Sequence, residues 1–341
     1  MLDAGVRDGQ LPQMVRDVGD ADYATGHQFR AGGYALSLFS RALRRLVLRA
    51  LADGPRRLAE LRRDVGGPAQ TTLRGNLDTL IEVGALEKCQ NDGKAGAPGN
   101  ALTPIGRELL AVTDAIEAWL RRAPEGPVRL ESETGKAAVK ALAGGWGSTM
   151  LRALAAQPFS LTELDNLISA FSYPALERRL AAMRLAGCVA PVQGNGGGTP
   201  YAVTEWLRQG MAPLLAAVRC ERRHLARDTA PLTRIDVEAI LLLIVPLAAF
   251  EPHADGVVEL AVGGGEESDG RSAGIRLTVR DGLPIRTTSK LEPGPESWVR
   301  GSASAWLDAL VDGDSDQLES SGDQALTLDF VDGLHRALFI S

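Results

Sequence analysis

The sequence predicts an α+β protein in which two similar, mainly helical units precede a third region rich in strands. A shift of 103 positions aligns nine apolar or glycine positions without a gap, for example Leu73 with Leu176 and Gly84 with Gly187. A match of this length in one register indicates a duplicated unit. After residue 231 the chain changes to short runs of strand-like residues bounded by turn residues. The expected domains are residues 34–123, 137–228 and 231–341.

Each of the first two units is expected to contain three helices, a hairpin and a closing helix. In the first unit, Leu73, Leu77 and Leu80 lie at helical spacing, and Gly84 ends that helix because glycine adopts the left-handed C-cap without steric cost. The expected elements are helices at 41–54, 58–66 and 68–84, a hairpin at 85–103 and a helix at 104–122. The second unit repeats this order at 148–158, 161–169, 172–187, 188–204 and 205–225. This is the order of a winged helix-turn-helix.

The third region is expected to form a sheet with helices. Its expected strands are 256–262, two strands within 274–288 joined by a tight turn at Asp281-Gly282, and 325–330. Trp306, Leu307 and Leu310 lie at helical spacing between these runs, which predicts a helix there.

The first unit has an outward face suited to DNA. With its leucines turned inward, a rotation of about 100° per residue turns polar groups and Gly75 outward on the third helix. The N-terminal half of a major-groove helix approaches the bases, and surrounding cations contact phosphates. Ordinary solvated charges explain any one of these residues, but not their convergence on one unit. The predicted DNA-binding residues are Arg56, Arg57, Arg62, Arg63, Thr71, Thr72, Arg74, Gly75, Lys88 and Lys94.

The second unit differs at the corresponding positions. Asp165 replaces Arg62, and Leu185 replaces Glu82 on the outward helix face. Apolar groups on an outward face suit protein contacts better than phosphates. We therefore expect one DNA-reading unit and one structural or dimerising unit. A homodimer is the assembly that would match a palindromic operator.

Charge is distributed unevenly along this chain of net charge −6. Residues 41–123 contain 14 Lys+Arg against 10 Asp+Glu, whereas residues 231–341 contain 8 against 19. Because counterion release depends on the contact surface, a mildly basic unit on an acidic chain can still bind DNA. The acidic end is expected to face away from DNA.

Other patterns argue against several classes of protein. The longest apolar run, residues 239–250, is interrupted by Pro246 and is too short to span a bilayer, and no signal peptide is visible. Three widely spaced cysteines form no metal or redox motif, which suits the cytoplasm. The four histidines lie far apart, without a nucleophile elbow or phosphate loop elsewhere. We therefore expect no membrane contact, metal, cofactor or enzymatic activity.

The motifs of residues 40–225 resemble the HxlR type of bacterial transcription regulators. That pattern ends in "L-T-x-x-G-x-x-L", which Leu102, Thr103, Gly106 and Leu109 supply in the first unit. In the second unit Val203-Thr204 keeps only part of it. The resemblance implies a winged helix-turn-helix fold and binding to double-stranded DNA.

The C-terminal region resembles a sterol-carrier-protein type domain, on the pattern "G-x-x-x-x-W-L-x-x-L" around Trp306. The resemblance implies a curved sheet with helices around an apolar tunnel, to which Trp298, Trp306 and Leu310 are assigned as ligand-binding residues. An ordinary core role for both tryptophans is the alternative. The predicted function is a DNA-binding regulator that responds to an apolar small molecule. A small-molecule binding or sequestering (resistance) protein, with winged helices as scaffold, is the alternative.

Overall fold

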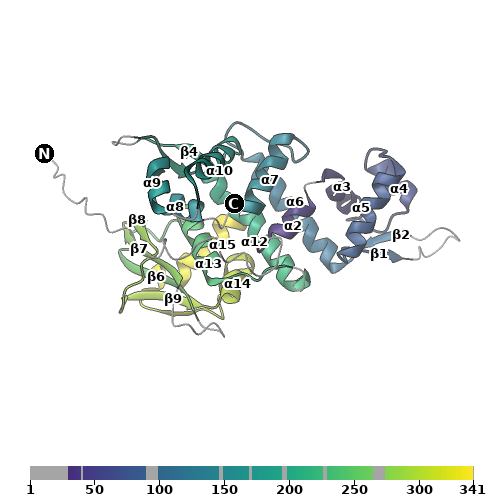
Figure 1. Cartoon of the computed structure of the whole chain (residues 1–341). Coiled ribbons are helices and arrows are strands. Elements are labelled where there is room, and N and C mark those ends of the chain that lie inside the picture. Colours follow the sequence, from purple (N-terminus) through teal and green to yellow (C-terminus); the bar gives the residue numbers. More distant parts are fainter. Residues whose placement is uncertain are drawn as a thin grey trace.

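The protein mixes helices and strands, as an α+β fold requires (Figure 1). The computed structural model describes residues 30–39, 41–89, 99–145, 149–168, 171–193, 198–225, 229–263 and 273–340. Figure 1 shows the first unit at one end of the molecule, with α4, α5 and the β1–β2 hairpin farthest from the C-terminal sheet.

The first unit has the helix order that its apolar spacing predicted. Its elements are α2 (Gly33–Leu38), α3 (Ala42–Ala50), α4 (Leu58–Asp64), α5 (Gln70–Glu82), β1 (Leu86–Cys89), β2 (Gly99–Leu102) and α6 (Pro104–Arg121). The leucines Leu73, Leu77 and Leu80 of α5 are buried, which confirms the predicted inner face. β1 and β2 pair antiparallel, and Arg56 adds a backbone bridge to Asn100 beside them.

Residues 133–225 show a second set of similar elements. They are α7 (Glu133–Gly145), α8 (Thr149–Ala156), β3 (Phe159–Ser160), α9 (Leu161–Leu167), α10 (Tyr173–Leu185), β4 (Val189–Pro191), β5 (Pro200–Val203), α11 (Glu205–Gln209), α12 (Met211–Cys220) and the π-helix η2 (Glu221–Leu225). The short strands form an antiparallel sheet in the order β3-β5-β4.

Local geometry recurs between the two sets. Helices α9 and α10 begin and end 103 positions after α4 and α5. Gly84 and Gly187, which follow α5 and α10, have φ angles of 73° and 71°, in the left-handed region that favours glycine. The hydroxyls of Thr103 and Thr204 donate to the carbonyl oxygens of these glycines at 2.6 and 2.8 Å. Each threonine also caps the helix that follows it.

A tryptophan pair joins the two sets of elements. The rings of Trp119 on α6 and Trp206 on α11 stack with centroids 4.7 Å apart. Each indole N–H donates to the backbone oxygen of the other residue, at 2.7 and 3.0 Å. Both side chains are almost completely buried, so both polar N–H groups are satisfied where water is excluded.

The C-terminal region is a five-stranded sheet with helices on one face. Its elements are α13 (Arg234–Ile244), η3 (Val245–Leu247), β6 (Gly256–Val262), β7 (Ala273–Arg280), β8 (Leu283–Thr288), β9 (Ser297–Gly301), α14 (Ala303–Asp312), β10 (Glu319–Ser321), η4 (Gln324–Leu326) and α15 (Leu328–Phe339). The strand order is β10-β9-β6-β7-β8, in which only β6 and β9 pair in parallel among the described strands. The predicted turn at Asp281-Gly282 is confirmed between β7 and β8.

The apolar run at 239–250 is accounted for by α13, whose residues Asp236–Ile244 are all buried. The buried Arg152 of α8 pairs with Glu238 of α13, and Glu238 also accepts a hydrogen bond from the Gly274 N–H of β7. α13 therefore connects the second unit to the sheet. No helix of the described residues combines the length and apolar character that a membrane crossing needs.

Two expected elements differ in the structure. The expected strand at 325–330 is wrong, because these residues belong to η4 and α15. The Asp323 side chain accepts from the Ala325 N–H, and Phe330 stacks on Phe250 with ring centroids 3.7 Å apart, which favours the helical path. The expected single closing helix at 205–225 is instead divided at Gly210. A Cβ at Gly210 would lie 3.1 Å from the Trp119 ring, so the junction between the units needs glycine there.

Candidate nucleic-acid interface

The turn between α4 and α5 fixes the position of the candidate recognition helix. Gly66 and Gly67 both have positive φ angles, and the Gly67 N–H donates to the Arg62 carbonyl oxygen at 2.7 Å. The Arg62 Nε–H donates to the Pro68 carbonyl oxygen at 2.9 Å. Arg62 therefore braces the turn with one donor and keeps the rest of its guanidinium exposed.

α5 begins with an open N-terminus. Its N-cap residue, Ala69, has no side chain that bonds the first turn. The residues at the start of the helix, Gln70, Thr71 and Thr72, are exposed. Unpaired amides at a helix N-terminus attract anions, and phosphate is the anion of a DNA backbone.

The outward face of α5 has the character that DNA contact requires. Thr71, Thr72 and Gly75 are exposed, as predicted for an outward face, and Arg74 on its flank is exposed too. Within the described part of the chain, the Arg74 side chain has no hydrogen bond or ion pair. The acidic residues of this helix, Asp78 and Glu82, lie in its C-terminal half. The N-terminal half therefore presents polar groups and one cation. The nearest carboxylate on the helix, Asp78, lies one turn after Arg74 and forms no ion pair with it in the described structure.

Within the described residues, Gly75 has no structural reason to be glycine. A Cβ built at this position would meet no atom within 4 Å. Glycine in a helix interior costs about 1 kcal/mol relative to alanine. No contact of the described fold offsets this cost. A glycine here is explained if another molecule approaches the helix closely at this position.

The four predicted arginines around α4 are not equally available. Arg63 is the most open, with a side chain that is 77% exposed and lies 3.9 Å from Asp64. Arg56 is half-buried, and its Nε lies 3.8 Å from Asp64. Arg57 precedes α4, where its backbone N–H donates to Glu60 and its Nε is buried. Arg63 is therefore the strongest phosphate candidate of the four.

The wing contributes less to the described site. Lys88 lies exposed on β1, opposite Asn100 on β2. Lys94 lies outside the described residues. The turn between α4 and α5 thus brings Arg62 and Arg63 close to the first turns of α5, and Lys88 lies on β1. Figure 1 shows the β1–β2 hairpin next to α5.

Gln70 is a further candidate for base contact that the sequence analysis did not name. It is the first residue of α5 and is exposed. Glutamine can form two hydrogen bonds with the major-groove edge of adenine. The Pro68-Ala69 pair was the sequence signal for this residue. A helix that begins directly after the pair places Gln70 in its first turn.

The corresponding surface of the second set of elements is different. Phe159 stands where Arg56 stands in the first unit and is buried, and Ser160 caps α9 with Glu163. Leu185 at the end of α10 is 87% exposed. The guanidinium of Arg179 lies over the Phe171 ring, 4.2 Å from its centroid. This surface offers fewer free cations and more apolar area than the first unit.

Two of the three residues assigned to an apolar ligand are buried in the core. Trp306 is fully buried and its indole N–H donates to the Ala261 carbonyl oxygen at 2.9 Å. Leu310 is also buried on the same helix. Trp298 is half-buried on β9, with the Arg300 guanidinium 4.5 Å from its ring centroid. In the described structure Trp306 and Leu310 pack in the core, and the apolar site remains a prediction.

Residues 40–126 match the family described as HxlR-like helix-turn-helix. This segment, which contains α3 to α6, is therefore an HxlR-like helix-turn-helix domain. The chain is also 34% identical over 107 residues to uncharacterized HTH-type transcriptional regulators of Mycobacterium bovis and Mycobacterium tuberculosis. The match covers 30% of this chain and 66% of each of those proteins.

Proposed function

We propose that the protein is a DNA-binding transcriptional regulator whose first unit reads an operator. The exposed N-terminal half of α5, with Arg74 free of partners in the described structure and Gly75 open to close approach, is the observation that carries this proposal. The HxlR-like match over the same residues and the names of the two mycobacterial relatives support it.

In this proposal α5 enters the major groove with its N-terminal turns facing the bases. Gln70 and Arg74 then contact base edges, while Arg62, Arg63 and Lys88 contact phosphates. Thr71 and Thr72 add hydroxyl groups at the groove, and Lys94 extends the basic set along the wing. Arg56 and Arg57 hold the strand and the helix that support this surface.

We further propose that residues 137–228 are a second winged helix that has a structural role. The matching bounds of α9 and α10, and the matched glycine and threonine geometry after each third helix, support a duplicated unit. The buried Phe159 and the acidic Asp165 replace basic residues of the first unit, which disfavours phosphate contact. Its exposed Leu185 suits a protein contact, and a homodimer through this face would present two readers to a palindromic operator.

Regulation by a small molecule in the C-terminal region is the finer part of the proposal. A ligand that binds two states of the protein unequally would change the affinity for DNA. Contacts that lead from the sheet through α13 to the second unit support such coupling. Glu238 of α13 accepts hydrogen bonds from both Arg152 of α8 and Gly274 of β7. A sequestering protein that uses the winged helices only as scaffold predicts ligand binding without DNA binding.

Fluorescence anisotropy with double-stranded DNA from the gene's own promoter region, at several salt concentrations, tests the proposal. Arg63→Ala is expected to reduce the salt slope by about 0.9, the share of one phosphate contact. Arg74→Ala should cost about 1–3 kcal/mol on the preferred sequence and less on random DNA. Arg178→Ala, at an exposed arginine on the equivalent face of α10, is the matched control and should bind as wild type. Unchanged binding in both first-unit variants would refute the assignment.

A further inference from the structure

The two faces of the C-terminal sheet differ in polarity. Along β6, Val258, Leu260 and Val262 are buried on the face that α13 and α14 cover. The alternate residue Glu259 lies on the opposite face, where the strand register continues it to Trp298 on β9. On the same face Arg300 of β9 lies opposite Glu319 of β10. The face away from the helices is therefore charged.

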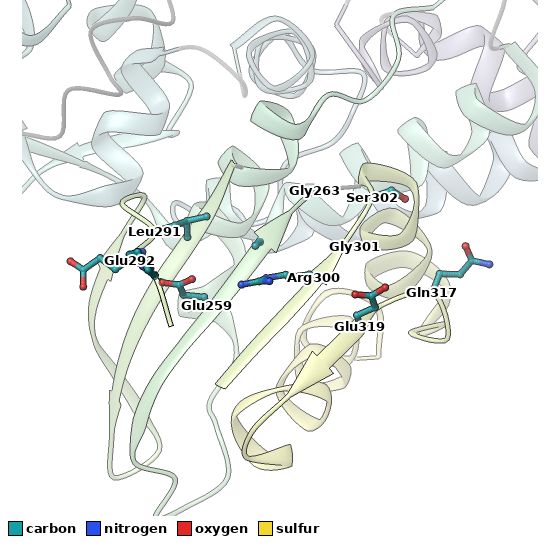
Figure 2. A pocket seen from close by; sticks show the side chains of 11 residues that line it. Glu259, Gly263, Leu291, Glu292, Arg300, Gly301, Ser302, Gln317 and Glu319 are labelled. Atoms are coloured by element: carbon teal, nitrogen blue, oxygen red, sulfur yellow. Dashed lines mark hydrogen bonds between the residues drawn. The ribbon is translucent and has the colours of Figure 1, made fainter. Parts of the chain in front are cut away.

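A cavity of about 700 Å³ opens on this charged face (Figure 2). Figure 2 shows Glu259, Arg300 and Glu319 on neighbouring strands, with Leu291 and Glu292 at one edge. The volume lies in the range of small-molecule sites, but the cavity is open to solvent and its lining is more polar than that of most such sites. Among the residues that the structure describes, the lining brings three carboxylates and one guanidinium to the cavity.

Glu259 is a buried carboxylate whose two described donors both bond the same oxygen. It is only 2% exposed. The Arg276 guanidinium and the Glu292 N–H both donate to Oε1, at 2.8 and 3.0 Å. Among the described residues no donor to Oε2 is present. Glu259 is therefore a paired carboxylate in the cavity wall, and its Oε2 keeps acceptor capacity for a further donor in the cavity.

Arg300 does not neutralise the carboxylates beside it. Its guanidinium lies over the Trp298 ring and, within the described chain, makes no ion pair with Glu259 or Glu319. Arg276 pairs with Glu259 and lies 3.6 Å from Glu292, which leaves the group of five charges with a net negative charge. A cationic ligand gains from this field, and an anionic one is repelled by it.

We propose that this cavity binds a small organic cation, an amine with an apolar stem. Ammonium groups would bond Glu259 Oε2, Glu292 and Glu319, while the stem would lie against Leu291 and Pro293. The inference rests on the proposed function in one respect, since it names the class of molecule to which the regulator responds. It places that molecule on the charged face of the sheet rather than among Trp306 and Leu310.

The position of the cavity suits communication with the rest of the chain. Ser302 lines it and also caps α14, accepting from the Ala305 N–H at 3.1 Å. Farther along α14, Asp312 pairs with Arg223 of η2. Arg223 also contacts Glu108 of α6, the closing helix of the first unit. A continuous series of contacts thus leads from the cavity to the helix-turn-helix domain.

Isothermal titration of the full chain with spermidine, a linear triamine, tests the proposal. Spermidine should bind wild type, and Glu319→Gln should weaken binding about tenfold or more, since a charged partner is lost. Arg300→Gln should tighten it, because a like charge leaves the cavity. The control is Glu251→Gln, at an exposed glutamate outside the lining, which should bind as wild type. Glu319 is itself exposed, so its replacement leaves the core intact.

A parallel titration with dodecanoate distinguishes the competing ligand classes. The proposal is overturned if spermidine gives no binding heat, if Glu319→Gln and Glu251→Gln behave alike, or if dodecanoate binds and loses affinity in Arg300→Gln. These titrations contain no DNA, so they are independent of the operator. A protein that binds spermidine as expected but ignores DNA would refute the proposed function alone.

Discussion

Replacing Gly75 should strengthen the fold and weaken DNA binding at the same time. Gly75 is the sixth residue of the 13-residue helix α5, and a Cβ there meets no atom within 4 Å. Alanine or leucine should therefore gain about 1 kcal/mol of helix stability with no steric cost. Both additions project from the face that we assign to the major groove.

The size of each effect follows from this geometry. A gain of about 1 kcal/mol lowers the equilibrium constant for local opening of α5 roughly fivefold, which slower hydrogen exchange of the α5 amides in the full chain would measure. Leucine fills the space between helix and base edges, so Gly75→Leu should lose at least about tenfold in DNA affinity, or 1.4 kcal/mol. Gly75→Ala should lose less, because a single methyl group displaces less of the interface.

Gly144 provides the matched control. It lies near the end of α7, is exposed, and a Cβ there also meets no atom within 4 Å. Gly144→Leu should leave DNA affinity unchanged. If Gly75→Leu bound DNA as tightly as wild type, or if its α5 amides exchanged faster, the reasoning about this face would be refuted.

Three further outcomes follow from buried groups. Burial raises the pKa of Glu221 to about 7, so its protonated form stabilises the fold below pH 4.5 and up to roughly 3 kcal/mol is lost as pH rises through 7; Glu221→Gln should flatten the pH dependence of unfolding between these values, and an unchanged slope would contradict this. Iodoacetamide should alkylate the half-buried Cys89 first, because burial raises the pKa of the other two cysteine thiols to about 12; equal labelling by mass spectrometry would oppose it. Arg152→Met should destabilise the protein by about 3–5 kcal/mol, because it leaves the buried Glu238 carboxylate without its cation, and adding Glu238→Gln should recover most of the loss in thermal unfolding; no recovery would show that the ion pair is not the cause.

The sequence predicted those elements whose structure depends on local spacing. α5 and α10 follow from leucine periodicity and a terminal glycine, and the β7–β8 turn follows from Asp281-Gly282. The failures depended on distant residues. Residues 325–330 contain apolar side chains that fit a strand as well as a helix, and the stack of Phe330 on Phe250 is a contact that no local pattern contains.

The candidate sites show the same division. Helical rotation correctly turned Thr71, Thr72 and Gly75 outward, and Arg74, which it placed on the flank, is exposed as well. It could not tell that Arg62 donates to Pro68, because that depends on the path of the turn. The charged cavity was also beyond reach, since Glu259, Arg300 and Glu319 come from three strands whose pairing is known only from the fold.

The stacked tryptophans also bear on how the protein behaves at low abundance. Two subunits that meet through such a contact separate on dilution, whereas Trp119 and Trp206 belong to one polypeptide. A covalent connection holds such partners at an effective concentration on the order of millimolar, far above that of a scarce protein in a cell. The supporting half therefore stays docked against the reading half when only a few copies exist. This contact therefore adds no assembly step of its own, so any dependence of operator occupancy on association comes only from contacts between chains, such as the proposed homodimer.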